Sequence, residues 1–462
     1  MIYLFTIILL TLLQLLAGFG VVTLCGIKLR PSLLLSLSLL LGIVVFSVIP
    51  FLLQLFYIPL TASFISIAIV IITWLLNWHF ARGIGELKQD LRGKKISIAV
   101  YEIPLMLVIT ALVLISVWRC FYLPPTPRDL TSGAEVIAEY AVKEKTLINS
   151  VFSVNLESTN NPFKPPYITS LQVIYKYAGF PFGQIWLSTI FIAFIIFLYA
   201  LLRQHLHRLL AGLLIIIFIA IPEMYAYTFM ALYDYSNAVF FCLSLYFLFR
   251  FFKSREKNLL FFSALLMAIA TYVRSETLIL AAVTAISLVI HHWRHKDNIK
   301  TILQSTFIFL LPSLVIYLIS VTLYINYYLP VQYNVEGLVR KNLFDFLPFV
   351  IRLFEMNDKV IFSSNGVSYY SYFIFIFIGI LLIDAIWKEK WDLQSLNWLF
   401  GVAVIYIGLP LIAHLFPLFD LDHSTKRGLF KIFPLMLLYM ANSRFLRHVS
   451  DKITMWENSY GR

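Results

Sequence analysis

Thirteen apolar runs separated by short polar connections dominate the sequence. They lie at about residues 2–24, 33–55, 57–78, 100–122, 183–202, 209–222, 237–252, 258–273, 277–293, 301–328, 369–387 and 395–415, with a last short run before residue 444. A helix needs about 20 apolar residues to cross the hydrocarbon core of a bilayer. Because the runs are continuously apolar rather than alternating, they argue against a transmembrane β-barrel. The sequence therefore predicts an all-α polytopic membrane protein with about 13 transmembrane helices.

The basic residues favour one side of this arrangement. If the N-terminus is outside and the C-terminus inside, the inner connections hold 22 Lys/Arg and 10 Asp/Glu, and the outer ones hold 14 of each. The inner excess of 22 − 10 equals the whole formal charge of +12, as the positive-inside rule expects. No basic charge is left over for a nucleic-acid-binding surface, so we expect no nucleic-acid partner. Because Lys28 and Arg30 follow the first run, it reads as a retained helix and not as a signal peptide.

The polar segments divide the chain into three parts. Residues 1–97 form an N-terminal three-helix transmembrane unit without intramembrane acids. Residues 98–440 form a second transmembrane module with outer loops at 123–182, 329–368 and 416–433, and residues 441–462 form a basic cytoplasmic tail. Ionisable groups at a membrane boundary are costly and are therefore functional candidates. Since the outer loops carry acids and bases together, we expect the functional site on the outer face.

The sharpest candidate is Asp129, in the long loop 123–182 directly after the turn PPTPR. A carboxylate held there suits a general base that deprotonates an acceptor hydroxyl. The alternative is an acid at a helix N-terminus, since Glu135 and Glu139 follow in an apparent helix.

Two further candidates lie later in the chain, one in the same loop and one at the start of a later helix. Lys164 lies in NPFKPPY, where prolines would present its ammonium group to a phosphate, although a solvated loop lysine is the simpler alternative. Asp234 opens a later helix among tyrosines that include Tyr233. These residues suit a sugar site, whereas the alternatives are a helix cap and an interfacial aromatic belt.

The remaining candidates are cations and acids at later outer turns. Arg274 and Glu276 lie in ATYVRSETL. Either they pair with each other in a tight turn, or Arg274 provides a cation for a phosphate headgroup. Lys426 and Arg427, before the last run, allow the same phosphate interpretation. The sequence has no glycine-rich phosphate loop and no HExxH motif. We therefore predict no metal and no cofactor, and expect an activated substrate to arrive within the membrane.

Together these features resemble the GT-C superfamily of polytopic glycosyltransferases, and most closely its protein O-mannosyltransferase and aminoarabinose transferase branch. The resemblance covers about residues 100–440 and rests on PRDLTSGAEVIAEYA, NPFKPPYITSLQ, ALYDYSNAVFFCLSLYFLF, ATYVRSETL and STKRGLFKIFPLMLL, in that order. One departure is that the first large outer loop follows the fourth run and not the first.

The resemblance implies an inverting hexosyl- or pentosyltransferase that uses a polyprenyl-phosphate sugar donor. Its acceptor would be a lipid, a glycan or a protein on the outer face of the membrane. Asp129 would match the catalytic base of the family, Lys164 the lysine that contacts the donor phosphate, and Arg427 a late cation near the headgroup. We therefore expect a bacterial inner-membrane protein whose active site faces the periplasm. The alternatives are a flippase for lipid-linked glycans and an O-antigen-type polymerase or ligase.

Overall fold

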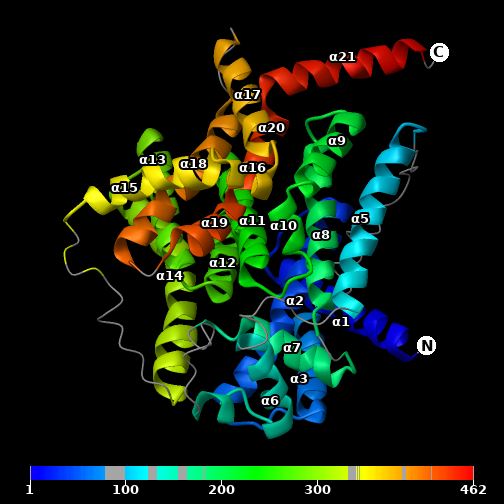
Figure 1. The fold of residues 1–462 in the computed structure, drawn as a ribbon, viewed down its shortest axis with the longest axis vertical. Helices are drawn as coiled ribbons and strands as arrows, with labels where there is room; N and C mark the ends of the chain where they lie inside the picture. The colour runs from blue at the N-terminus through cyan, green and yellow to red at the C-terminus, as the bar shows by residue number, and fades with distance from the viewer. Residues whose placement is uncertain are drawn as a thin grey trace.

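The computed structural model describes residues 2–78, 99–122, 133–153, 164–180, 183–330, 340, 342, 344–387, 392–417 and 419–460, and these contain helices and no strand (Figure 1). Each of the thirteen predicted apolar runs coincides with a helix. The all-α prediction is therefore confirmed over the described residues.

The helices up to residue 226 are α1 (Ile2–Leu24), α2 (Pro31–Leu55), α3 (Ala62–Leu76), α5 (Glu102–Tyr122), α6 (Glu135–Glu144), η2 (Ser150–Ser153), α7 (Tyr167–Tyr177), α8 (Ile185–Leu202), α9 (Arg208–Ile219) and α10 (Pro222–Ala226). The next are α11 (Tyr233–Ser254), α12 (Lys257–Val273), α13 (Thr277–Arg294), α14 (Ile299–Tyr317), η3 (Leu318–Tyr328), α15 (Leu347–Glu355), η5 (Met356–Ile361), α16 (Ser364–Tyr370) and α17 (Phe373–Ile386). The last are α18 (Leu393–Leu415), η6 (Leu421–Thr425), α19 (Lys426–Gly428), η7 (Leu429–Lys431), α20 (Ile432–Asn442) and α21 (Arg444–Tyr460).

Eight of the described helices are long and apolar enough to cross a membrane, and the number rises to ten if each of two bent pairs forms one span. The bends are 94° between α16 and α17, and 55° between the segment Leu421–Asn442 and α21. Helices α3, α9 and α12 are apolar but shorter. About 13 transmembrane helices were expected, and eight to ten of the corresponding helices meet this length criterion.

Local sequence signals set several helix starts. Pro31 begins α2, where a proline suits the first turn because its missing N–H group has no intrahelical partner there. Thr61 caps α3, since its Oγ1 accepts a hydrogen bond from the Phe64 amide at 3.3 Å. Asn298 caps α14 in the same way through the Thr301 amide at 2.8 Å. Such caps satisfy amide groups that would otherwise be exposed to lipid or buried without an acceptor.

The first two helices approach each other closely through glycine. A Cβ atom at Gly18 would overlap the carbonyl oxygen of Ser38, and one at Gly42 would overlap that of Gln14. Small residues allow this contact between apolar helices, for which lipid supplies little hydrophobic driving force. Since α2 also packs against α7 and α8, the first three helices share a core with later parts of the chain.

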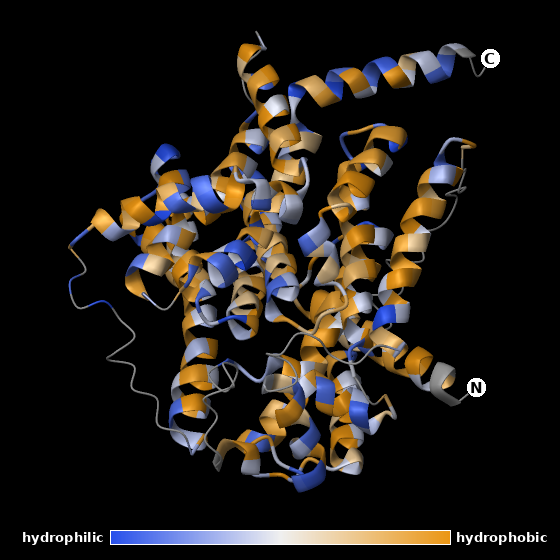
Figure 2. Ribbon diagram, in the orientation of Figure 1, coloured by the Kyte–Doolittle hydropathy of each residue, from blue (hydrophilic) through white to orange (hydrophobic). Residues whose placement is uncertain are grey.

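Helix α11 lies at the centre of the molecule, and 89% of its apolar window is buried (Figure 1). It contacts α12, α18 and α20. By contrast, α5 exposes Leu107, Leu114 and Trp118, as expected for a lipid-facing helix. Figure 2 shows this pattern as long hydrophobic helices with hydrophilic residues collected at helix ends and connections. Because α11 is buried, the polar residues of its first turn lie inside the protein.

The two ends of the bundle are built differently. Helices α6 and α7, from the predicted outer loop 123–182, lie at the lower end of Figure 1, and α21 runs across the upper end. Helix α15 lies against α18 and has no buried residue.

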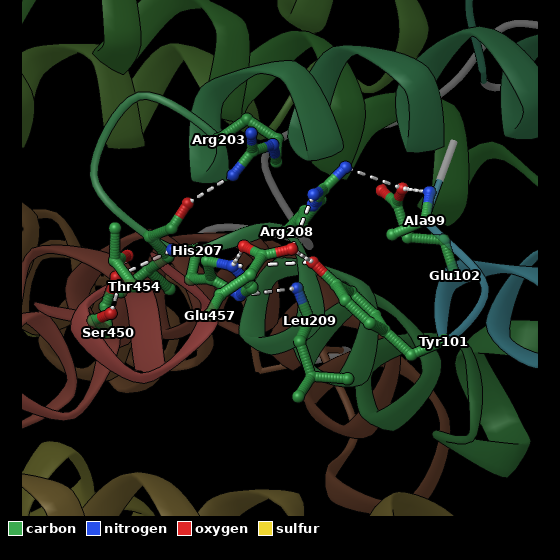
Figure 3. A network of polar contacts seen from close by, with 11 residues as sticks. Ala99, Tyr101, Glu102, Arg203, His207, Arg208, Leu209, Ser450, Thr454 and Glu457 are labelled. Atoms are coloured by element: carbon green, nitrogen blue, oxygen red, sulfur yellow. Dashed lines mark hydrogen bonds and ion pairs between the residues drawn. The ribbon is translucent and has the colours of Figure 1, made fainter. Parts of the chain in front are cut away.

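A polar network attaches α21 to the ends of α5 and α9 (Figure 3). Glu457 accepts from Arg208 at 2.6 Å and Tyr101 at 3.0 Å, and lies 2.8 Å from the His207 ring. Arg208 also pairs with Glu102 at 3.2 Å. We call these five residues the Glu457 network. All five are predicted to be cytoplasmic, so the structure brings together groups that the charge pattern assigns to one side.

Candidate functional site

Arg274 is the centre of the main buried ionic cluster. It directly follows α12, and its guanidinium pairs with the carboxylates of Asp234 and Glu276. The Arg274 and Asp234 side chains are only 11% and 4% exposed. The predicted Arg274–Glu276 pair thus exists. Arg274 also pairs with Asp234, which lies on another helix and 40 residues away along the chain.

Asp234 lies in the first turn of α11 but does not cap that helix. The N-cap residue is Leu232, which has an extended backbone conformation and provides no side-chain cap. A carboxylate in the first turn is favoured by the helix dipole, and here it also holds the Arg274 guanidinium. The cap alternative for Asp234 is therefore wrong, and the acid serves the ionic cluster.

Lys164 reaches the same place from the loop before α7. Its Nζ atom lies 5.0 Å from the centroid of the Tyr233 ring, in a cation–π contact. Tyr233 is 3% exposed and neighbours Asp234 in α11. Only Pro165 and Pro166 lie between Lys164 and α7, so the lysine is close to the start of a well-buried helix.

Lys431 is a site residue that the sequence reasoning missed. It ends η7, is 1% exposed, and lies close enough for its charge to act on Glu276. Burial opposes ionisation of Glu276, but the charges of Arg274, Lys431 and Lys164 outweigh burial and lower its pKa. The signal was present, because Lys431 interrupts the apolar segment GLFKIFPLML as Arg274 interrupts ATYVRSETL. We call Lys164, Tyr233, Asp234, Arg274, Glu276 and Lys431 the Arg274 cluster.

Lys426 and Arg427 form a neighbouring group. Lys426 pairs with Glu223 of α10 at 2.8 Å, and its Nζ lies 4.0 Å from the Tyr369 ring centroid. The Arg427 guanidinium lies 5.9 Å from the ring centroid of Tyr227. Burial raises the pKa of Tyr227 to about 12, against the charges of both Arg427 and Arg274. Tyr227 thus lies between this group and the Arg274 cluster.

The combined charge of these two groups is positive. The five cations Lys164, Arg274, Lys426, Arg427 and Lys431 face the three acids Asp234, Glu276 and Glu223. An arginine held in place by carboxylates presents a fixed set of N–H donors, which suits a phosphate. The arrangement is therefore suited to binding a phosphate-bearing ligand among tyrosines.

An apolar cavity has Tyr272, two residues before Arg274, in its wall. It has a volume of about 460 Å³ and is lined by residues of α1, α2, α3, α12 and α14. All of its lining side chains are apolar except Tyr272. Tyr272 precedes Arg274 by two residues, and its ring centroid lies 6.0 Å from that of Tyr167, the first residue of α7. An alkyl or prenyl chain in this cavity would have its end near the cations.

A second ionic group joins α6 to α7. Glu135 pairs with Lys176 and accepts a hydrogen bond from Gln172 at 2.5 Å, and Gln172 in turn accepts from the Trp186 indole at 3.0 Å. Burial raises the pKa of Glu135, while Lys176 and Gln172 oppose that shift. Because every polar group here is satisfied, the arrangement fixes α6 on α7.

The predictions of a general base and of no metal ion concern groups outside these clusters. The predicted base Asp129 lies outside the described residues, which leave a gap at 123–132. Within the described part of the chain, no group of three or more His, Cys, Asp or Glu side chains could hold a metal ion. His423 lies 2.7 Å from Asp420 and has no third partner of this kind.

Residues 160–325 match the family dolichyl-phosphate-mannose-protein mannosyltransferase, which is a GT-C family. The matched region contains Lys164, Tyr233, Asp234, Arg274 and Glu276, and ends before Lys431. Neither the search of curated proteins nor the search of solved structures gave a match. Over these residues the match bears out the predicted resemblance to the GT-C glycosyltransferases.

Proposed function

We propose that this membrane glycosyltransferase of the GT-C type transfers a sugar from a polyprenyl-phosphate donor to an acceptor on the outer face of the membrane. The observation that carries the proposal is the Arg274 cluster, which gathers four sequence segments at one end of the central helix α11. The name of the matched family, which specifies a sugar linked to a lipid phosphate, supports this donor class.

The donor phosphate would bind among the cations of the cluster. When the bond between the sugar and the phosphate breaks, negative charge develops on the leaving polyprenyl phosphate. Lys164, Arg274 and Lys431 supply positive charge at that point, and Asp234 and Glu276 hold the guanidinium in a fixed orientation. Donors positioned before the reaction need little reorganisation in the transition state. Lys426 and Arg427 extend the positive region towards Glu223.

The apolar cavity beside Tyr272 would hold the first part of the polyprenyl chain. Its lining comes from five helices, and its volume of about 460 Å³ fits a few isoprene units rather than a whole chain. Since Tyr272 lies near both the cavity and Arg274, a lipid there would place its phosphate at the cations. The remaining chain would extend into the bilayer.

Asp129 would act as the general base. In an inverting transfer the acceptor hydroxyl attacks the anomeric carbon from the face opposite to the leaving phosphate, and a carboxylate takes the hydroxyl proton. The acceptor oxygen gains the bond to the sugar, while the phosphate oxygen leaves with the electron pair. Tyr233, already in contact with Lys164, would bound the sugar site, and its ring suits a hexose or a pentose.

The decisive experiment replaces Asp129 by Asn in the full-length protein. General-base catalysis contributes about 10²- to 10⁴-fold, so we expect transfer to fall by at least about 100-fold while donor binding remains. Transfer is measured with a panel of polyprenyl-phosphate sugars and radiolabelled products, and binding by thermal stabilisation with the same donors.

The matched control is Glu139→Gln, which alters an exposed acid of the same predicted loop and should keep full activity. Transfer by Asp129→Asn at the wild-type rate would contradict the role of Asp129. Movement of intact lipid-linked glycan across the membrane without transfer would favour the flippase alternative. Use of diphosphate-linked oligosaccharides alone would favour a polymerase or ligase.

A further inference from the structure

A second cavity lies at the end of α11 remote from the Arg274 cluster. It has a volume of about 220 Å³ and lies between the last turns of α11 and the first turns of α18. Arg250 and Lys253 of α11 line it, together with Gln394, Asn397 and Trp398 of α18. Arg250 follows Asp234 by 16 residues, or about 24 Å along a helix. The cavity is therefore separate from the proposed active site and lies at the predicted cytoplasmic surface.

Its cations form no ion pair, and its indole N–H forms no hydrogen bond, within the described part of the chain. Among the described residues, neither Arg250 nor Lys253 forms an ion pair, although Arg250 lies over the rings of Tyr246 and Phe247 at 5.9 and 5.8 Å. Trp398 is 3% exposed, and its indole Nε1 has no hydrogen-bond partner in the part of the chain that the structure describes. Buried donors are normally satisfied, so an unpaired indole N–H in the wall of a cavity points to a bound acceptor.

The electrostatic surroundings favour an anion. Asp392 is the one carboxylate among the lining residues, and Arg447 lies 3.4 Å from it and compensates its charge. Burial, followed by the charge of Arg447, lowers the pKa of the nearby His205 to about 4, and Lys253 acts in the same direction. Among the described residues, no carboxylate pairs with Arg250 or Lys253.

The rest of the wall suits a lipid headgroup. Phe249, Phe252 and Leu393 give it apolar surface next to the cations, and the Gln394 and Asn397 amides add polar groups. Cations between helices at the cytoplasmic side of a membrane protein attract anionic headgroups. Guanidinium and indole N–H groups both donate readily to phosphate oxygens.

We propose that this cavity binds a phosphate ester, presented by an anionic lipid of the inner leaflet, through Arg250, Lys253 and the indole N–H of Trp398. A free phosphate ester would offer the same oxygens, so the two sources are separated by experiment. Binding joins α11 to α18 and stabilises the bundle at the end opposite to the proposed active site.

Native mass spectrometry of the full-length protein tests the proposal. Phosphatidylglycerol, phosphatidylcholine and soluble glycerol 3-phosphate are added separately to detergent-solubilised protein. We expect one retained phosphatidylglycerol and at least about tenfold weaker retention of phosphatidylcholine. In R250Q/K253Q, retention of phosphatidylglycerol should fall by at least about tenfold. In Trp398→Phe, which keeps a ring but loses the N–H group, it should fall about threefold to tenfold.

The matched control is Lys257→Gln, an exposed lysine on the same side that does not line the cavity and should leave binding unchanged. Binding of glycerol 3-phosphate that depends on Arg250, without lipid retention, supports the phosphate site and assigns it to a soluble ester. Wild-type retention of phosphatidylglycerol in R250Q/K253Q overturns the proposal. If that double variant fails to fold, undiminished retention in Trp398→Phe overturns it instead. Because no readout involves sugar transfer, failure here is independent of the proposed function.

Discussion

The Arg274 cluster and the Glu457 network are both built from ion pairs between distant segments, but they differ in charge balance and burial. In the Glu457 network two carboxylates, Glu102 and Glu457, surround a single arginine, with His207 and Tyr101 as further partners. In the Arg274 cluster Lys164 and Arg274 face the acids Asp234 and Glu276. The third basic group, Lys431, is 1% exposed, and burial lowers its pKa to about 7.

This difference is what we expect between a structural attachment and the proposed binding site. A surface-proximal network without surplus positive charge contributes modest stability and offers no site for an anion. A buried cluster with surplus positive charge is costly in the empty protein, because burial removes the cations from water. That cost is offset when an anion binds, which is the property a phosphate site needs. The following variants test this interpretation, in order of decreasing effect.

Replacing Arg274 by Gln should have the largest effect. It removes the central cation and leaves Asp234 and Glu276 buried together, so we expect transfer activity to fall about 10²- to 10³-fold. Breaking a buried pair should also destabilise the protein by about 3–5 kcal/mol. Activity is measured per folded protein, with folding monitored by size-exclusion chromatography and thermal unfolding.

The matched variant in the other region is Arg208→Gln. Arg208 is 22% exposed, so its loss should cost about 1 kcal/mol or less and leave transfer within about twofold of wild type. Similar losses of activity in the two variants would contradict the assignment of different roles to the two regions.

Replacing Lys431 by Met should separate binding from stability. Methionine has a similar shape without the charge, so the desolvation cost of a buried ammonium disappears and the melting temperature should stay equal or rise. The donor phosphate loses one cation, so we expect donor affinity to fall about tenfold. Thermal shifts with and without donor provide both readouts. A lower melting temperature with unchanged donor affinity would identify Lys431 as a structural residue.

The smallest effect is the pH dependence of the Glu457 network. Hydrogen bonds from His207 and Arg208 lower the pKa of Glu457 to about 2. A lowered carboxyl pKa adds stability that is complete above the unfolded-state pKa of about 4.3 and is lost as the pH falls towards about 2. In Glu457→Gln the melting temperature should therefore depend less on pH between about 5 and 3. If the melting temperature depended on pH equally in wild type and variant, Glu457 would not be the source of this pH dependence.

Sequence reasoning identified most of the Arg274 cluster from local signals. Arg274 and Glu276 interrupt apolar runs, Asp234 opens a helix among tyrosines, and prolines flank Lys164 in the long polar loop. Lys431 was missed because it was grouped with the polar segment before the last helix. The pairing of Arg274 with Asp234 could not be predicted, since it depends on how α11 and α12 pack. Lys426 and Arg427 were also selected, but their contacts with Glu223 and Tyr227 required the fold.

The sequence by itself determined that the chain is a bundle of apolar helices, because hydrophobic run length and the absence of alternation are local properties. It also predicts which loops share a side, through the distribution of lysine and arginine. Only the tertiary structure decided which charges meet, because helix packing brings together residues that lie far apart in the chain. It gave Arg274 two acids, placed Lys431 beside them, and put Arg250 and Trp398 in the wall of one cavity.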